Sequence, residues 1–458
     1  MADSAQPMNV VVVAADTLRT AYLGAYGNPW IQTPNIDRFA SEGVRFSRAH
    51  PECLPTIPTR RTLHSGRRAF PFLGYDPVPW DNVYLPGWQP MSPDEPTVAE
   101  RLIEAGYHTG FVADVPHYFV PGMNFTRGFR QWEFVRGQAE DRWGAAAHAD
   151  EKLLRKYRGN ENRIRAHIVN VKPEQPEEEW PTARTFRWAM RFVEQNRGTT
   201  PFYLYVDSFT PHETWESPLH YYELYGDVDV REPMWLTVPY GSANDHPDIE
   251  PQLPSIRANY AGLVTMVDTW FGRLLDTIDR VGLSDNTLVV FLSDHGTNFA
   301  DNAERVLGKP ANALYPGTMD IPLIVRSPGA TRGQVVDEFV TTLDVPATVL
   351  AAAGADGDVA GRDLRALVDR QEYVTCRYGN FAWYRDADTW FFSSVDFSDP
   401  KVFDLVDDPT CATNIADRAA DRIARARERL LADAGAAMPF YRRRSATDAI
   451  GRPQFDAE

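Results

Sequence analysis

Residues 9–17 read N-V-V-V-V-A-A-D-T. A short run of β-branched and small apolar side chains is typical of a strand buried on both faces, as in a parallel sheet. Asp16 follows this predicted strand directly, and ligand groups gather at the carboxyl ends of strands in open α/β sheets. Asp16 is therefore a candidate catalytic or metal-binding carboxylate. The alternative interpretation is an aspartate that caps the next helix.

Strand and helix patterns alternate from residue 9 to about residue 355. This alternation predicts an α/β fold with a mostly parallel central sheet and helices on both faces. We expect further strands at 44–49, 108–114, 202–207, 286–292 and 321–326, and helices beginning at Thr33 and at 96–105, 180–197, 256–281 and 344–353.

Two parts of the chain depart from this pattern. Residues 115–180 are rich in aromatic, glycine and charged residues, and we interpret them as a variable insertion over the sheet face of a main domain that spans residues 1–360. Residues 361–458 form a predicted small C-terminal α+β subdomain. It would hold strands at 373–378 and 389–395 and a helix at 419–434 that Gly435 ends.

Residues 56–67, T-I-P-T-R-R-T-L-H-S-G-R, combine hydroxyls, arginines and a histidine on one predicted helix. Pro58 suits the first helical turn, and Gly66 suits its end. A helix that begins near Thr56 would place this hydroxyl at the positive helix end, with Arg60 one turn further on. Such an arrangement suits a tetrahedral oxyanion. The alternative is a surface helix with a threonine cap.

A second polar group follows the predicted strand N-T-L-V-V-F-L, where Asp294 and His295 come after Ser293. The carboxyl ends of parallel strands meet at one edge of a sheet, so these two side chains should approach Asp16. Carboxylate, imidazole and hydroxyl groups together suit a divalent metal ion. We therefore expect a metal pocket built from Asp16, Asp294 and His295, with the Thr56 hydroxyl beside it.

The bulk composition limits the partners. The chain of 458 residues has a formal net charge of −16, which disfavours nucleic acid as a partner. Its three cysteines lack paired spacing, so we expect neither a disulfide framework nor a cysteine zinc site. No stretch is apolar enough for a membrane span, and the start lacks the pattern of a signal peptide. The expected location is the cytoplasm, without membrane contact.

The ordered series of motifs resembles the sulfatases and the phosphonate or phosphodiester hydrolases of the alkaline phosphatase superfamily. The resemblance covers most of the chain apart from residues 115–180 and 215–255. It is carried by V-V-V-V-A-A-D-T-L-R, T-P-N-I-D-R-F-A-S-E-G-V-R-F, T-I-P-T-R-R-T-L-H-S-G-R, D-S-F-T-P-H-E, L-V-V-F-L-S-D-H-G, L-G-K and I-P-L-I-V-R-S-P-G.

The resemblance implies a role for each matching position. Asp16, Asp294 and His295 would hold the metal, and Thr56 occupies the position of the nucleophile. Arg60 would orient it and bind the oxyanion. The resemblance also implies that Lys309 contacts a non-bridging oxygen and that His212 faces the leaving group. Two further candidates for substrate contact are His64 and Trp215, for which core packing is the alternative.

The departures from the family pattern bear on the chemistry. Sulfatases carry a cysteine or serine that becomes formylglycine, whereas this chain has Thr56, whose β-carbon bears a methyl group and cannot become an aldehyde. Threonine is the direct nucleophile in the relatives that act on phosphorus esters. Those relatives bind two metals, but no histidine follows His295. Thr17 replaces a second aspartate, and the Lys-x-His pair expected after the third strand is missing.

These departures predict a site for one metal with few carboxylates, which suits Mn²⁺ or Zn²⁺ better than Ca²⁺. Three functions remain open. The first is a metal-dependent hydrolase of phosphate or phosphonate esters that uses Thr56. The second is a sulfate ester hydrolase without formylglycine, and the third is a degenerate member that binds an anion or a partner without turnover. The expected partner is a small anionic ester, and a homo-oligomer is compatible with the family.

Overall fold

The computed structural model describes residues 7–74, 83, 85–172, 174–199, 201–230, 232–367, 370–435, 437–447 and 453–457. Its centre is an eight-stranded sheet. In spatial order the strands are β13 (Gln334–Thr341), β2 (Val44–His50), β12 (Leu323–Arg326), β9 (Thr287–Ser293), β1 (Asn9–Ala15), β6 (Phe202–Ser208), β3 (His108–Ala113) and β4 (Gln131–Phe134).

The sheet is mostly parallel, as the sequence predicts. Strand β1 pairs in parallel with β6 and β9, and only β12 runs against its neighbours. Val10, Val12 and Ala14 point to one face of the sheet, and Val11 and Val13 point to the other. All five are buried in two separate hydrophobic clusters, one on each face. The short apolar run in β1 thus suits a strand covered on both sides.

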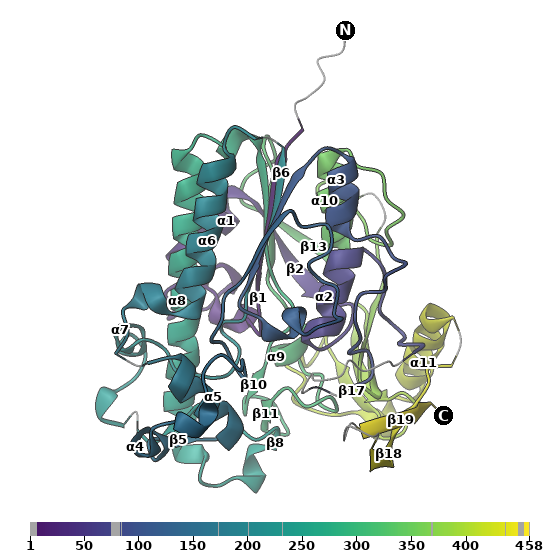
Figure 1. Ribbon diagram of the computed structural model, residues 1–458. Helices are drawn as coiled ribbons and strands as arrows, with labels where there is room; N and C mark the ends of the chain where they lie inside the picture. The colour runs from purple at the N-terminus through teal and green to yellow at the C-terminus, as the bar shows by residue number, and fades with distance from the viewer. Residues whose placement is uncertain are drawn as a thin grey trace.

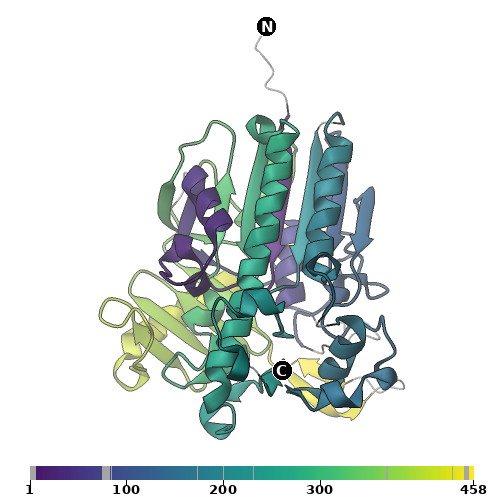
Figure 2. The same cartoon turned by 90° about the vertical axis from the view of Figure 1, so that its left-hand side faces the viewer.

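Helices cover both faces of the sheet (Figure 1). One face carries α1 (Pro34–Glu42), α6 (Pro181–Asn196) and α8 (Leu253–Arg280), and the other carries α2 (Thr56–Ser65), α3 (Val98–Glu104) and α10 (Asp344–Ala353). Figure 2 shows α6 and α8 side by side over the first face. The layers are those of an α/β fold with a mostly parallel central sheet, as expected. In the described part of the chain, every helix is too short or too polar to cross a bilayer.

The segment interpreted as an insertion has two parts. Strand β4, at residues 131–134, extends the central sheet beside β3 and does not lie over its face, which corrects the expectation. Residues 149–170 form a small lobe with α4 (Glu151–Leu154), β5 (Tyr157–Arg158) and α5 (Glu161–Asn170). Strand β5 pairs with β7 (Met234–Trp235), so the two segments without a family counterpart pack on each other.

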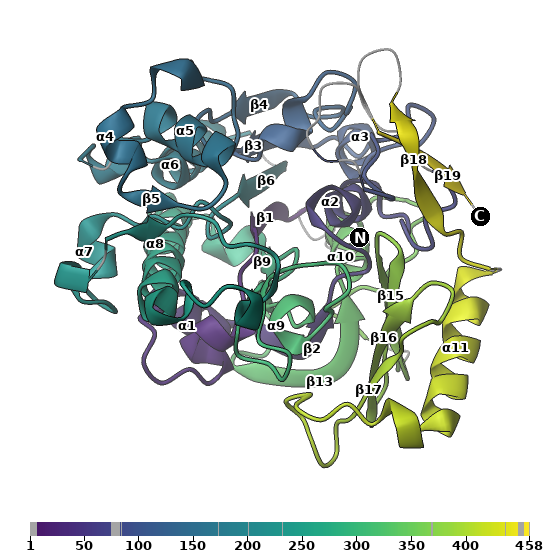
Figure 3. The same ribbon diagram turned by 90° about the horizontal axis from the view of Figure 1, so that it is seen from below.

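The C-terminal region has its own antiparallel sheet, seen from below in Figure 3. Helix α11 packs on one face, and the other face packs against the segment that leads into α2. The backbone N–H of Leu54 donates to the carbonyl of Arg377 at 2.9 Å, which fixes the approach to Thr56. The elements are β14 (Val374–Tyr378), β15 (Phe381–Arg385), β16 (Thr389–Ser394), β17 (Lys401–Asp404), α11 (Ala420–Ala434) and a hairpin of β18 (Tyr441–Thr447) and β19 (Pro453–Ala457).

Candidate active site

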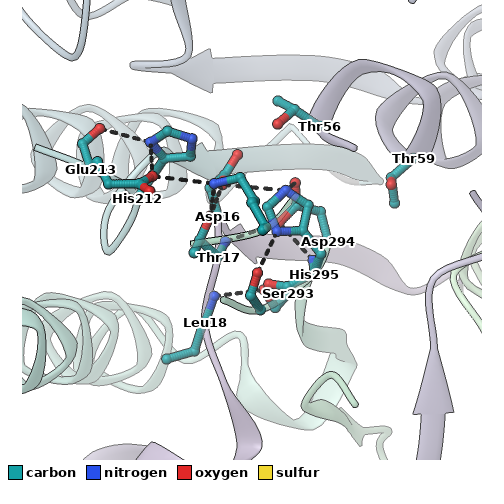
Figure 4. A network of polar contacts seen from close by, with 12 residues as sticks. Asp16, Thr17, Leu18, Thr56, Thr59, His212, Glu213, Ser293, Asp294 and His295 are labelled. Atoms are coloured by element: carbon teal, nitrogen blue, oxygen red, sulfur yellow. Dashed lines mark hydrogen bonds and ion pairs between the residues drawn. The ribbon is translucent and has the colours of Figure 1, made fainter. Parts of the chain in front are cut away.

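Strands β1 and β9 bring three candidate metal ligands together at their carboxyl ends. One ligand atom each from Asp16, Asp294 and His295 lies within 4.8 Å of the others, and all three side chains are fully buried. The hydroxyl of Ser293 donates to the carbonyl of His295 at 2.8 Å and accepts the backbone N–H of Leu18 at 2.9 Å. The ends of the two strands are thereby held in register (Figure 4).

The imidazole of His295 is arranged as a ligand. Its Nδ1 lies 3.0 Å from the carbonyl of Gly296, which can only accept, so Nδ1 carries the proton and Nε2 presents a lone pair. Burial lowers the pKa of His295 to about 4, so the ring is neutral at pH 7. Among the described residues its Nε2 atom has no hydrogen-bond partner, although it lies 3.3 Å from Asp294 Oδ2. A lone pair facing a carboxylate at this distance calls for a cation between them.

The two carboxylates of this triad differ in their proton affinity. Burial and the charge of Asp294 raise the pKa of Asp16 well above its usual range. Burial also acts on Asp294, but Arg60 and His295 outweigh it and lower the pKa of this carboxyl. A divalent cation would let both carboxylates ionise. The donor set of two carboxylates and one neutral imidazole therefore fits a metal ion.

Thr17 connects the two strand ends through a strained backbone. Its φ is 63°, a value that β-branched residues rarely adopt. In this conformation its N–H donates to Asp294 Oδ1 at 3.1 Å, and its hydroxyl donates to Asp16 Oδ1 at 2.5 Å. Strain of this kind persists where the surroundings enforce it, and here it holds both carboxylates in place.

Arg60 lies at the centre of the acidic cluster. Its guanidinium contacts Asp16 Oδ2 at 3.0 Å and also contacts Asp294 Oδ2. It forms a two-pronged pair with Asp207, the second-last residue of strand β6. Arg60 thus neutralises part of the negative charge and ties α2 to three strands. Sequence reasoning missed Asp207, although it follows the apolar run F-Y-L-Y-V just as Asp16 follows its own strand.

Thr56 is the first residue of α2, and Gly66 ends this helix with a φ of 70°, as predicted. The Thr56 side chain is buried, and within the described chain its hydroxyl has no hydrogen-bond partner. Its carbonyl accepts from Arg60 Nη1 at 3.5 Å, which places the helix start beside the acidic cluster. The Thr56 hydroxyl therefore takes part in no hydrogen bond within the described chain. It lies at a helix N-terminus, where anions are stabilised.

Lys309 and His212 border the same cluster. Lys309 follows β11 (Val306–Gly308), and its Nζ donates to Thr17 Oγ1 and to Glu213 Oε2, both at 3.2 Å. The Nδ1 of His212 lies 2.7 Å from the carbonyl of Glu213, so this nitrogen carries the proton. Burial and the charge of Lys309 lower the pKa of His212 well below its ordinary value, which keeps its Nε2 available as an acceptor. Glu213, the other residue that sequence reasoning missed, is the partner of both.

Two predicted substrate contacts lie elsewhere. His64 is caged by aromatic rings and has a pKa lowered to about 3 by burial and by Arg60. Trp215 is fully buried, packs on Phe299 and Tyr260, and donates its indole N–H to the carbonyl of Pro211 at 3.1 Å. The structure therefore places both in the packed interior and not on an open surface of the site. The rings around His64 belong to Phe111, Tyr118, Phe125, Phe129 and Tyr205.

This chain is similar to several known proteins. The family model described as sulfatase matches residues 8–355. An arylsulfatase from Clostridium perfringens is 26% identical over 89% of this chain and 90% of its own length. A multifunctional alkaline phosphatase superfamily protein, PehA of Trinickia caryophylli, is 25% identical over 76% of this chain and 74% of its own.

A solved structure shares the fold. The phosphonate monoester hydrolase of Agrobacterium radiobacter superposes with a TM-score of 0.69 at 21% identity, and the match covers 93% of this chain and 96% of that one. At this identity the likeness concerns the fold alone. Together with the family model and the buried Asp-Asp-His cluster, it leads to one conclusion: the chain is a hydrolase that belongs to the sulfatase family of the alkaline phosphatase superfamily.

Proposed function

We propose that this protein hydrolyses phosphate or phosphonate esters with Thr56 as the direct nucleophile. The observation that supports this most is a threonine hydroxyl to which no other described residue is hydrogen-bonded, at the start of a helix whose Arg60 contacts the candidate metal ligands. The methyl group on its β-carbon excludes formylglycine. A phosphoryl group on threonine can be removed by attack of water at phosphorus, which regenerates the hydroxyl.

The ligands proposed for the cation are Asp16, Asp294, His295 and the Thr56 hydroxyl, and this set suits Mn²⁺ or Zn²⁺. When bound, such a cation supplies positive charge that lowers the pKa of the hydroxyl and offsets the charge of the oxyanion. Arg60 holds the carboxylates and adds positive charge next to the reacting phosphoryl group. The proposed partner is a small anionic ester, with neither nucleic acid nor membrane.

In the first half of the reaction, Thr56 Oγ forms a bond to phosphorus, and the bond from phosphorus to the ester oxygen breaks. Lys309 has three N–H donors, of which Thr17 and Glu213 accept two. The third can bind a phosphoryl oxygen or protonate the departing alkoxide. In the second half, the neutral His212 can take a proton from the water that attacks the phosphothreonine.

The test offers the purified protein, loaded with Mn²⁺ or Zn²⁺, four esters of p-nitrophenol or phenol. These are a phosphate monoester, a phosphate diester, a phosphonate monoester and a sulfate ester. We expect release from at least one phosphorus ester, and loss of that release in Thr56→Ala. The matched control is Thr269→Ala, which removes a threonine hydroxyl that donates to the carbonyl of Thr265 within α8. Mass spectrometry of an acid-quenched reaction should find one phosphoryl group on Thr56.

The name of the clostridial relative favours a second candidate, a sulfate ester hydrolase that uses an unmodified hydroxyl. Release from the sulfate ester alone would replace the first proposal with this one. No release from any ester, with metal bound, would instead support an anion-binding protein without turnover. Activity that survives Thr56→Ala would point to an activated water as the nucleophile.

A further inference from the structure

A large cavity lies next to the candidate active site, between the two segments that have no family counterpart. Its volume is about 870 Å³, and it is lined by Glu140, Asn160 and Arg163 from the first segment and by Thr237 and Tyr240 from the second. Both segments lie at the same end of the molecule as β8 (Gly241–Ser242) and β11 (Figure 1). Nothing in the chemistry proposed above uses this cavity.

A chain of hydrogen bonds joins the cavity to the reacting centre. The hydroxyl of Tyr240 donates to Glu213 Oε1 at 2.9 Å, and Glu213 Oε2 accepts from Lys309 at 3.2 Å. The Nζ of Lys309 lies 5.9 Å from the centre of the Tyr240 ring. Tyr240 lines the cavity, so an ester held at Lys309 would reach the cavity by extending past Tyr240. This is the side of His212 and Lys309, where the alcohol departs.

The cavity wall presents unused donors next to an unused acceptor. Arg163 donates through Nε to Glu140 Oε1 at 2.7 Å. Among the described residues, no hydrogen bond uses the two terminal nitrogens of Arg163, and the buried Oε2 of Glu140 also has no partner. Glu140 Oε2 is buried, and a buried polar atom without a partner is unfavourable, so a ligand group that satisfies it gains affinity.

The wall also holds Asp141, Arg142 and Arg165, and the unused atoms described above belong to Arg163 and Glu140. A purely anionic group would meet the Arg163 donors but would be repelled by the neighbouring Glu140 carboxylate. An alkyl group would leave both residues unsatisfied. A hydroxyl both donates and accepts, so adjacent hydroxyls can satisfy Glu140 and Arg163 together. The size of the cavity admits a ring that carries several hydroxyls.

We propose that this cavity binds the alcohol part of the ester and selects a polyhydroxylated alcohol through Arg163 and Glu140. The proposal rests on the phosphate ester hydrolysis proposed above, because that reaction places an alcohol on this side of Lys309. It makes the insertion, and not the strand ends, the part of the chain that determines substrate preference.

The test compares two phosphate monoesters of equal ring size, myo-inositol 1-phosphate and cyclohexyl phosphate. Turnover is followed by phosphate release from the metal-loaded protein. Binding is measured separately by calorimetry in Thr56→Ala, which needs no turnover. We expect the inositol ester to be preferred by about tenfold or more in both kcat/KM and Kd, because a site built for hydroxyls rejects the analogue that lacks them.

Variants assign this preference to the cavity wall. Arg163→Met should reduce the preference for the inositol ester to near one, while cyclohexyl phosphate is bound as before. Arg163→Lys keeps the positive charge but loses the planar guanidinium. It replaces Arg163→Met in the test if that variant does not fold. Arg191→Met, at an exposed position on α6, should keep the wild-type preference.

The two proposals fail in different ways. A Kd ratio near one in Thr56→Ala, or no binding of either ester, overturns the assignment of the cavity whatever the turnover. A preference that Arg163→Met and Arg163→Lys both retain overturns it as well. Preferential binding of the inositol ester without phosphate release by the wild-type protein would keep the cavity assignment and contradict the proposed hydrolysis.

Discussion

Arg60 and Asp207 form a two-pronged ion pair between α2 and the central sheet. The distance from Arg60 Nε to Asp207 Oδ2 is 2.9 Å, that from Nη2 to Oδ1 is 2.7 Å, and both side chains are fully buried. Because Arg60 is one turn after Thr56, this pair also sets the position of the proposed nucleophile. The pair joins Arg60, which the resemblance to the family identified, to Asp207, which the resemblance did not identify.

Asp207→Asn should therefore lower both stability and activity. The variant removes one of the three carboxylates around Arg60 and weakens the buried hydrogen bonds of the pair, which costs about 1–3 kcal/mol. We expect a loss of this order in the free energy of unfolding by urea, and a fall in kcat/KM of at least about tenfold as α2 shifts. The control Asp276→Asn breaks an exposed ion pair with Arg38. It should change the free energy of unfolding and kcat/KM only slightly. Wild-type values for Asp207→Asn would contradict the proposed role.

His295→Ala should weaken metal binding more than it weakens the fold. The wild-type protein is expected to gain about 2.7 kcal/mol of stability at a metal concentration one hundred times the Kd, because the metal binds only the folded state. Thermal unfolding after chelation, with and without Mn²⁺ or Zn²⁺, measures this gain, and elemental analysis counts the bound ions. His220→Ala removes a half-exposed histidine and should keep the gain. Equal metal content in both variants would exclude His295 as a ligand.

Asp114→Asn should change the pH dependence of stability. Burial raises the pKa of Asp114 from 3.8 to about 7. Between these values the folded protein holds a proton that the unfolded chain has released, so this carboxyl lowers the free energy of unfolding as the pH rises. Asparagine does not titrate. The free energy of unfolding of the variant should therefore rise relative to that of the wild type between pH 4 and pH 7, by up to about 4 kcal/mol.

Urea unfolding at pH 5 and at pH 8 measures this difference. The gain of Asp114→Asn over the wild type should be larger at pH 8 than at pH 5. The exposed Asp248→Asn should show the same difference at both values. A gain that does not depend on pH would mean that Asp114 is ionised throughout this range.

His167→Ala should loosen the lobe that forms the cavity wall. His167 and Arg163 share α5, and the His167 ring lies 2.6 Å from Glu216 Oε2 through Nε2 and 2.9 Å from the Thr214 hydroxyl through Nδ1. Loss of these buried hydrogen bonds is expected to cost about 1–3 kcal/mol. Hydrogen exchange of α5 should quicken, and KM should rise more than kcat falls. His148→Ala, at an exposed position, is the control.

Much of the fold could be predicted because local patterns determine it. The helix at 344–353 and the glycine ends of α2 and α11 follow from periodicity and from residues that adopt positive φ. Strand β13 was not predicted, because most of its first five residues are exposed and its pairing with β2 shifts register after Val336. Strand β4 was assigned to the insertion for a related reason, since its residues are mostly exposed at the sheet edge.

The site residues that directly follow a buried strand could be predicted from the sequence. Asp16 and Asp294 were identified because each lies just after a buried strand. The same criterion applied to β6 identifies Asp207. The pairing of Arg60 with Asp207 spans 147 positions in the sequence, and no local pattern records it. The interior positions of His64 and Trp215 also depend on distant elements, because their rings are enclosed by β3, α8 and the segments around them. The roles of the site residues stay predictions until the variants are measured.

The separation between the strand ends and the paired β5–β7 lobe has an evolutionary consequence. The candidate metal ligands stand at the ends of β1 and β9, whereas the walls of the cavity belong to two segments outside the central sheet. New preferences could arise in this lineage by exchange of residues 136–170 and 234–242 alone. Grafting these two segments together between homologues is thus a direct route to enzymes with altered selectivity.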